Sequence, residues 1–288
     1  INSASLAKFH RYQGGLLCVT ENSINLFSNK GEKKWSTPIQ ISNPVLRVKG
    51  SYILLFEQGG RKFLVYKNKN LVFEAQSKNN ILMGNISSSG DTIFATDKEY
   101  YKGAVSVYNN SGEEIYQRNF GNESVISADI SDSRKIAVSL MNVTNQVVST
   151  VVYFDVFDEE EKERVSYENT IIYDLDFVGN TLFAYADDKL IALNERGKQE
   201  WIHNFDGKNL KHYQKDKSDV SVLLFDNNNN SEFSVINSSG KEKQKIKTEI
   251  IPDFCDICDG YIIYNNGRNL FLTKINGEYL AKYTLLNE

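Results

Sequence analysis

Short apolar runs alternate with polar turns along the chain, and this alternation repeats. Each copy has an apolar strand, a polar turn centred on Asn or Asp with Gly, and a second strand that opens on charged residues. The copies occupy residues 24–35, 63–70, 105–116, 190–201, 233–240 and 270–277, with Asn and Lys replacing Gly in the second. A tight hairpin turn needs a residue with positive φ, which Gly or Asn adopts at least cost. The pattern therefore predicts a series of β-hairpins.

The spacing of the turns predicts a seventh copy. Turn residues fall at positions 31, 69, 112, 197, 240 and 277, which leaves one interval of double length. We expect the missing copy near residue 155, with a strand over residues 151–156 and an expanded polar turn over residues 158–164. Seven copies in 288 residues give a period of about 41, which lies within the range of propeller blades.

A second apolar run precedes each hairpin, for example at residues 52–56, 181–185 and 261–264. These runs are continuous, which is typical of strands covered on both faces. A weaker strand ahead of each run gives four strands per unit. The sequence therefore predicts an all-β fold, a seven-bladed β-propeller of four-stranded antiparallel blades. We expect a single domain over residues 1–288, with blades starting near residues 1, 43, 80, 123, 169, 208 and 249, and residues 278–286 as the last outer strand.

Composition narrows the function classes. The net charge of −4 provides no basic footprint, which argues against a nucleic-acid partner. No apolar run approaches the length of a membrane-spanning helix. Three cysteines exclude a fold built on a disulfide scaffold. We expect a protein that is monomeric and works without a cofactor.

Two Gly-x-x-x-Trp motifs, at residues 31–35 and 197–201, resemble the repeats of PQQ-like and WD40-like propellers. In those repeats the Trp lies on the outermost strand and packs against the next blade, and Phe73 and Tyr116 occupy the equivalent place in two other copies. The whole chain resembles DUF5711, a Firmicute propeller family of unknown function. The resemblance implies an extracytoplasmic propeller of a Gram-positive bacterium, anchored by an N-terminal membrane segment that would precede Ile1. It implies no activity and no functional residues.

Acidic residues occur on several of the predicted innermost strands. These candidate channel-facing residues are Asp129, Asp174, Asp176 and Asp256. Converging there, they could bind a cation or a basic ligand. Basic residues occupy other innermost strands, namely Arg11, Arg47, Lys49, Lys211 and His212. We therefore favour charge pairing and hydrated channel walls. No calcium-loop motif is present, and no metal site is predicted.

Cys255 and Cys258 form a C-x-x-C motif, which in other settings is a redox pair or half of a zinc site. Here the motif lies in a predicted strand, where side chains three positions apart point to opposite faces. A structural role is the better interpretation, and Cys18 is expected to be a small core residue. Residues 226–230 are interpreted as a solvated hairpin turn instead of a metal loop.

No nucleophile elbow, P-loop or H-E-x-x-H motif is found, so no catalytic residues are predicted. The favoured hypothesis is a non-catalytic protein-interaction or scaffold module at the cell envelope, with exposed tyrosines such as Tyr100 and Tyr101 as contacts. One alternative is a ligand sensor that binds a small molecule or cation in the channel. A lyase or hydrolase is a further alternative, for which Asp129, Asp174 and Asp176 are the only candidates.

Overall fold

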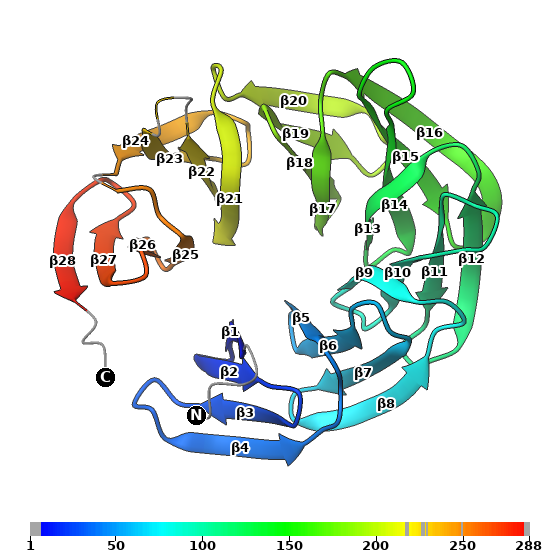
Figure 1. The fold of residues 1–288 in the computed structure, drawn as a ribbon, viewed down its shortest axis with the longest axis horizontal. Helices are drawn as coiled ribbons and strands as arrows, with labels where there is room; N and C mark the ends of the chain where they lie inside the picture. Colours follow the sequence, from blue (N-terminus) through cyan, green and yellow to red (C-terminus); the bar gives the residue numbers. More distant parts are fainter. Residues whose placement is uncertain (1–6, 217–218, 226–227, 229, 249, 285–288) are drawn as a thin grey trace. The chain divides into compact units, whose positions relative to one another are not determined.

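The computed structural model describes residues 7–216, 219–225, 228, 230–248 and 250–284. In this part, the chain forms seven four-stranded antiparallel sheets, the blades of a propeller, and each sheet has its strands in chain order (Figure 1). No helix is present among the described residues, so none that could span a membrane. The all-β, seven-bladed prediction is confirmed.

The strands have the following bounds, from blade 1 to blade 7: β1 (Lys8–Tyr12), β2 (Gly15–Val19), β3 (Ser23–Phe27) and β4 (Lys33–Pro38); β5 (Pro44–Lys49), β6 (Tyr52–Glu57), β7 (Lys62–Lys67) and β8 (Asn70–Gln76); β9 (Ile81–Ile86), β10 (Thr92–Thr96), β11 (Gly103–Tyr108) and β12 (Glu114–Phe120); β13 (Ser124–Ile130), β14 (Lys135–Asn142), β15 (Val148–Asp155) and β16 (Asp158–Glu168); β17 (Ile172–Val178), β18 (Thr181–Ala186), β19 (Lys189–Asn194) and β20 (Gln199–Asn204); β21 (Asn209–Asp216), β22 (Asp219–Phe225), β23 (Ser231–Ile236) and β24 (Glu242–Lys247); β25 (Phe254–Cys258), β26 (Tyr261–Asn265), β27 (Asn269–Lys274) and β28 (Tyr279–Thr284).

Two compact units make up the chain. The first comprises Ile1–Leu182 with Glu195–Gly197, and the second comprises Phe183–Asn194 with Lys198–Glu288. Blades 1 to 4 belong to the first unit and blades 6 and 7 to the second, and the boundary falls within the sequence of blade 5.

The predicted hairpin turns close through both backbone and side chain. In blade 6, the amide of Gly240 donates to the carbonyl oxygen of Asn237 (3.0 Å), and Gly240 has φ +77°. The side-chain oxygen of Asn237 accepts from the amides of Ser239 (2.9 Å) and Lys241 (3.0 Å). Asn109 closes the turn of blade 3 with the same set of bonds. The Asn before the turn Gly is thus a structural residue.

A β-bulge follows the turn between the third and fourth strands of every blade. The residue of the fourth strand next to this bulge occupies an equivalent position in all seven blades. This position holds Trp35, Phe73, Tyr116, Glu163, Trp201, Gln244 and Ala281 in blades 1 to 7. Its side chain lies against the turn of the following blade where the contact is described, as for Phe73 on Gly112 and Trp201 on Gly240. The equivalence of Phe73 and Tyr116 to the two tryptophans is therefore confirmed by register.

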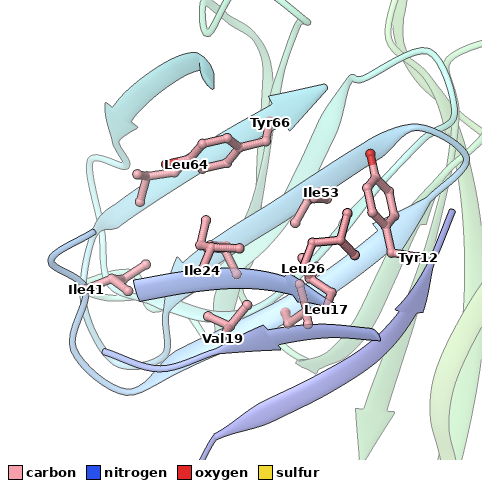
Figure 2. Packing of buried hydrophobic residues seen from close by; sticks show 11 residues of the cluster. Tyr12, Leu17, Val19, Ile24, Leu26, Ile41, Ile53, Leu64 and Tyr66 are labelled. Atoms are coloured by element: carbon pink, nitrogen blue, oxygen red, sulfur yellow. The ribbon is translucent and has the colours of Figure 1, made fainter. Parts of the chain in front are cut away.

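Apolar packing between neighbouring blades forms the core. Figure 2 shows this for blades 1 and 2, where Leu17, Ile24 and Leu26 pack with Ile53 and Leu64. Strands β6, β10, β14 and β18 are almost wholly buried, as their continuous apolar runs predict. Burial of this kind stabilises by roughly 1.5–3 kcal/mol for each large side chain.

The prediction that strand β26 is buried on both faces is wrong. Ile262 and Tyr264 are buried, but Tyr261 and Ile263 are exposed. The reason is that blade 7 is the last blade of the second unit. Its buried residues pack on blade 6, and among the described residues of this unit no further blade covers the other face.

The prediction of an expanded polar turn over residues 158–164 is also wrong. The turn after β15 is short, since Asp155 pairs with Asp158, and the charged residues beyond it form the long outer strand β16. Charged side chains suit an edge strand, because they discourage pairing with other chains. The last blade obtains its outer strand β28 from the C-terminal segment, as predicted. Asp226, Asn227 and Asn229 of the predicted solvated turn lie outside the described residues.

Candidate functional site

Polar side chains link the innermost strands of the first unit. Arg47 Nε on β5 donates to Asn85 Oδ1 on β9 (3.2 Å), and Asn85 Nδ2 donates to the carbonyl oxygen of Ala128 on β13 (2.9 Å). Ser127 Oγ on β13 then donates to Asp174 Oδ1 on β17 (2.8 Å). Four blades are therefore joined at their inner edges by hydrogen bonds.

Nearby, Lys49 joins two of the predicted acids in an ion cluster. Its Nζ lies 3.3 Å from Asp129 Oδ2 and 3.4 Å from Asp176 Oδ1. Asp129 Oδ2 also accepts from the amide of Phe177 (2.6 Å). The Asp129 side chain is only 2% exposed, and within the described part of the chain its second oxygen, Oδ1, has no hydrogen-bond partner. We name Lys49, Asp129 and Asp176 the inner ion cluster.

Burial and charge act in opposite directions on the pKa values of the cluster. It raises the pKa of Asp129 to about 7, against the lowering effect of Lys49 and with a further increase from Asp176. Burial would lower the pKa of Lys49, but the two carboxylates outweigh it and raise that pKa. The ammonium group of Lys49 thus lies where a cation bound by Asp129 and Asp176 would lie. Among the described residues, no group of three or more His, Cys, Asp and Glu side chains could hold a metal ion.

Asp256 belongs to the second unit. Its Oδ1 accepts from the amide of Ile257 (2.8 Å), and its carboxylate acts on the half-buried His212. Burial lowers the pKa of His212, against smaller raising effects of a backbone bond with Cys255 and of Asp256. Of the four acids predicted from the sequence, the structure thus brings Asp129 and Asp176 together through Lys49, bonds Asp174 to Ser127, and places Asp256 in the second unit.

Cys18 and Cys255 are buried free thiols. Cys255 lies on β25 and packs in the core between blades 6 and 7, where burial raises its pKa to about 12. A thiol with this pKa is a poor nucleophile, because the thiolate is the reactive form. The side chain of Cys258 lies outside the described residues, so the C-x-x-C interpretation stays a prediction.

The loop between β10 and β11 carries two exposed tyrosines. Tyr100 is 93% exposed and has φ +65°, a left-handed conformation that is unfavourable for an aromatic residue. Asp97 fixes one end of the loop by accepting from Asn80 N (2.8 Å) and Asn80 Nδ2 (2.7 Å). At the other end, the amide of Lys102 donates to the carbonyl oxygen of Phe120 (2.8 Å). The sequence indicated the tyrosines but not the strained backbone that presents them.

A groove of about 660 Å³ lies between blades 1 and 2, beside β8. It is lined by residues 37–40 at the end of blade 1 and by Lys62, Leu64, Tyr66, Lys69, Asn70, Leu71 and Glu74 of blade 2. Sequence reasoning missed this groove. The low charge of β8 (NLVFEAQ) was the available signal, since the other outer strands of the first unit carry more charge.

A comparison with known families gives a match that extends over the whole chain. The model of a family of unknown function, DUF5711, matches residues 1–288. The chain belongs to the DUF5711 family. A search of curated proteins gives no match.

Solved structures similar to this DUF5711 protein show its fold. BamB from Moraxella catarrhalis is 11% identical with a TM-score of 0.61, and the match covers 99% of this chain and 91% of BamB. The computationally designed Ika8 protein is 10% identical with a TM-score of 0.63, covering 96% and 82%. Sqt1 from Saccharomyces cerevisiae is 11% identical with a TM-score of 0.61, covering 96% and 86%. A designed protein and natural proteins of distant organisms share the fold, so the fold does not select a function.

Proposed function

We propose that this DUF5711 protein is a non-catalytic protein-binding propeller whose contact surface includes the loop between β10 and β11. The observation that carries the proposal is Tyr100, an almost fully exposed aromatic side chain on a strained backbone. Strain of about 1–3 kcal/mol persists only where the surroundings enforce it, and it gathers at functional positions. Tyrosine is among the residues that contribute most to binding energy at interfaces.

Two features of the loop suit binding. Asp97 and Lys102 anchor both ends, so little conformational freedom is lost when a partner binds. Tyr101 (47% exposed) adjoins Tyr100 on the same loop, and Val143 (63% exposed) lies on the corresponding loop of blade 4. Together they offer apolar contact area at one end of the blades.

The inner ion cluster weighs against the alternatives. A sensor for a cation or basic ligand would need free carboxylates, but Lys49 already lies between Asp129 and Asp176. A lyase or hydrolase with paired carboxylates would meet the same obstacle, because an internal cation holds both acids.

The test is affinity purification of the full-length protein from cross-linked cells of its source organism. The variant is Tyr100→Ala. Its matched control is Phe157→Ala, which removes another exposed aromatic residue, 76% exposed, from a hairpin turn at the other end of the third strands. We expect Tyr100→Ala to reduce recovery of a specific partner about tenfold, as loss of about 1.4 kcal/mol would. Equal recovery of every co-purified protein by both variants would refute the proposal.

The proposal includes a location outside the cytoplasmic membrane, with an N-terminal membrane anchor and a monomeric propeller. The family resemblance supports this location. Labelling of intact cells with a membrane-impermeant amine reagent tests it, because exposed lysines such as Lys69 would react without lysis. Labelling that requires lysis would contradict an extracytoplasmic location.

A further inference from the structure

The groove between blades 1 and 2 has an apolar floor. Leu64 and Tyr66 of β7 are buried in it, and Leu71 of β8 is 49% exposed beside them. Its other wall is the segment 37–40, where blade 1 ends and the chain crosses to blade 2. Trp35 packs edge-on against Tyr66, with ring centroids 5.9 Å apart. A volume of about 660 Å³ lies within the range of sites that hold a ligand.

Strand β8 is the outermost strand of blade 2. Among the described residues it pairs only with β7, so its other edge has no partner strand in the sheet. Edge strands are usually protected by charged residues. Strand β16 has this protection along most of its length. The only charged residue of β8, Glu74, is paired with Lys62 at 2.9 Å, and Leu71 and Val72 are exposed. This edge is therefore open to another strand.

The register relates the open edge to the groove. Leu64 pairs with Glu74, and Tyr66 pairs with Leu71, and all four residues line the groove. Side chains of directly paired residues lie on the same face of a sheet. A strand added to the edge of β8 would therefore place every second side chain over this face, beside Leu71 and Glu74.

The charged residues that line the groove favour an acidic ligand. Lys62 is neutralised by Glu74. Lys69 is exposed in the turn before β8 and, in the part of the chain that the structure describes, forms no ion pair. The charged residues that line the groove thus leave one positive charge in excess, at the end next to Lys69. An acidic side chain is the complement of this end.

We propose that the groove beside β8 binds an extended, acidic peptide segment of a partner protein by strand addition. Apolar side chains of the segment lie beside Leu71 on the groove face of β8, and a carboxylate pairs with Lys69. This surface uses other residues than the Tyr100 loop, so it can succeed or fail independently of the proposed function.

The test uses two short synthetic peptides that alternate valine and threonine around a central glutamate or a central lysine. Binding is measured by fluorescence anisotropy with the whole chain. We expect the glutamate peptide to bind about tenfold more tightly than the lysine peptide, and Lys69→Glu to reverse this preference. The matched control is Lys30→Glu, in the exposed hairpin turn of blade 1, which should leave the preference unchanged. Because Lys69 is exposed, its replacement leaves the fold intact, which thermal unfolding verifies.

Amide hydrogen exchange tests strand addition directly. On binding of the glutamate peptide, amides of residues 70–76 should exchange more slowly. The proposal is overturned if neither peptide binds at millimolar concentration, if Lys69→Glu leaves the preference unchanged, or if residues 70–76 keep their exchange rates. It is also overturned if light scattering shows a dimer that Lys69→Glu dissociates, because the occupant would then be a second copy of this chain.

Discussion

The indole ring of Trp201 lies directly on the backbone of Gly240, in the hairpin turn of the next blade. Trp201 Nε1 donates to the carbonyl oxygen of Ser238 in that turn (3.0 Å). A Cβ atom at Gly240 would lie 2.5 Å from the ring carbon Cδ2, closer than non-bonded carbons approach. The position thus requires glycine for two reasons, its φ of +77° and the ring above it.

Replacement of Gly240 by alanine should therefore destabilise the fold more than its backbone angle alone explains. Gly207 is the matched control in the same unit, because it has φ +78° and no atom within 4 Å of an added Cβ. We expect Gly207→Ala to cost about 1 kcal/mol and Gly240→Ala to cost about 1–3 kcal/mol more. Urea unfolding measures both. Equal costs would mean that the ring moves away freely.

A pH dependence should follow from Asp129. Burial, opposed by Lys49 and reinforced by Asp176, raises its pKa from 3.8 to about 7, so between these values the folded chain binds a proton that the unfolded chain releases. Its contribution to stability is full below the unfolded pKa and is lost as the pH rises through about 7. Relative to Asp129→Asn, the wild-type free energy of unfolding should fall from about pH 5 to pH 8, by up to about 1.4 kcal/mol per unit. Parallel urea-derived curves for the two proteins would contradict this expectation.

Replacement of Lys49 should also change the stability of the fold in a pH-dependent way. Lys49→Met leaves Asp129 and Asp176 without their cation, so we expect a loss of about 2–4 kcal/mol near pH 8. The loss should be smaller near pH 5, where Asp129 is protonated. The control is Lys78→Met, which breaks an ion pair with Glu114 (2.7 Å) in which the lysine side chain is 67% exposed, and which should cost less than about 1 kcal/mol. A Lys49→Met effect that is independent of pH would contradict the ion cluster as described.

The thiol of Cys255 should be unreactive in the folded protein. Burial raises its pKa to about 12, so at pH 8 it is protonated and covered. We expect iodoacetamide to modify Cys255 only after unfolding, as read by mass spectrometry of the peptide that contains it. Rapid modification of the native protein would show that β25 opens locally.

We propose that residues 1–288 fold as one domain, and the repeat of about 41 residues along the whole length supports this. A single domain should unfold in one calorimetric transition, with equal van't Hoff and calorimetric enthalpies. Two resolved transitions would instead match the two compact units.

The sequence was sufficient for the fold because its signals are local. A turn Gly with Asn before it predicts a hairpin without knowledge of the rest of the chain, as Asn237 and Gly240 illustrate. The error at β16 has a local cause as well. A highly charged segment resembles a turn, but an outer strand also faces solvent and accepts the same residues.

The candidate sites were less predictable because they depend on contacts between distant residues. Lys49, Asp129 and Asp176 were each named from the sequence, but not which of them pair, because Lys49 lies 80 and 127 positions from the two acids. Only the packing of the inner strands within the first unit brings them together. The groove beside β8 depends on how residues 37–40 lie against β7 and β8, which no pattern in the sequence defines. The φ of Tyr100 likewise depends on bonds to other segments.

The contact between Trp201 and Gly240 gives neighbouring blades a direction, because, where the contact is described, an outer strand supplies a side chain to the turn of the next blade. Such a repeat carries both the side chain that contacts the blade after it and the turn glycine that receives the side chain of the blade before it. A gene duplication that copied a whole repeat would add both parts of this joint at once. A chain of this kind could gain or lose blades in evolution without inventing a new contact.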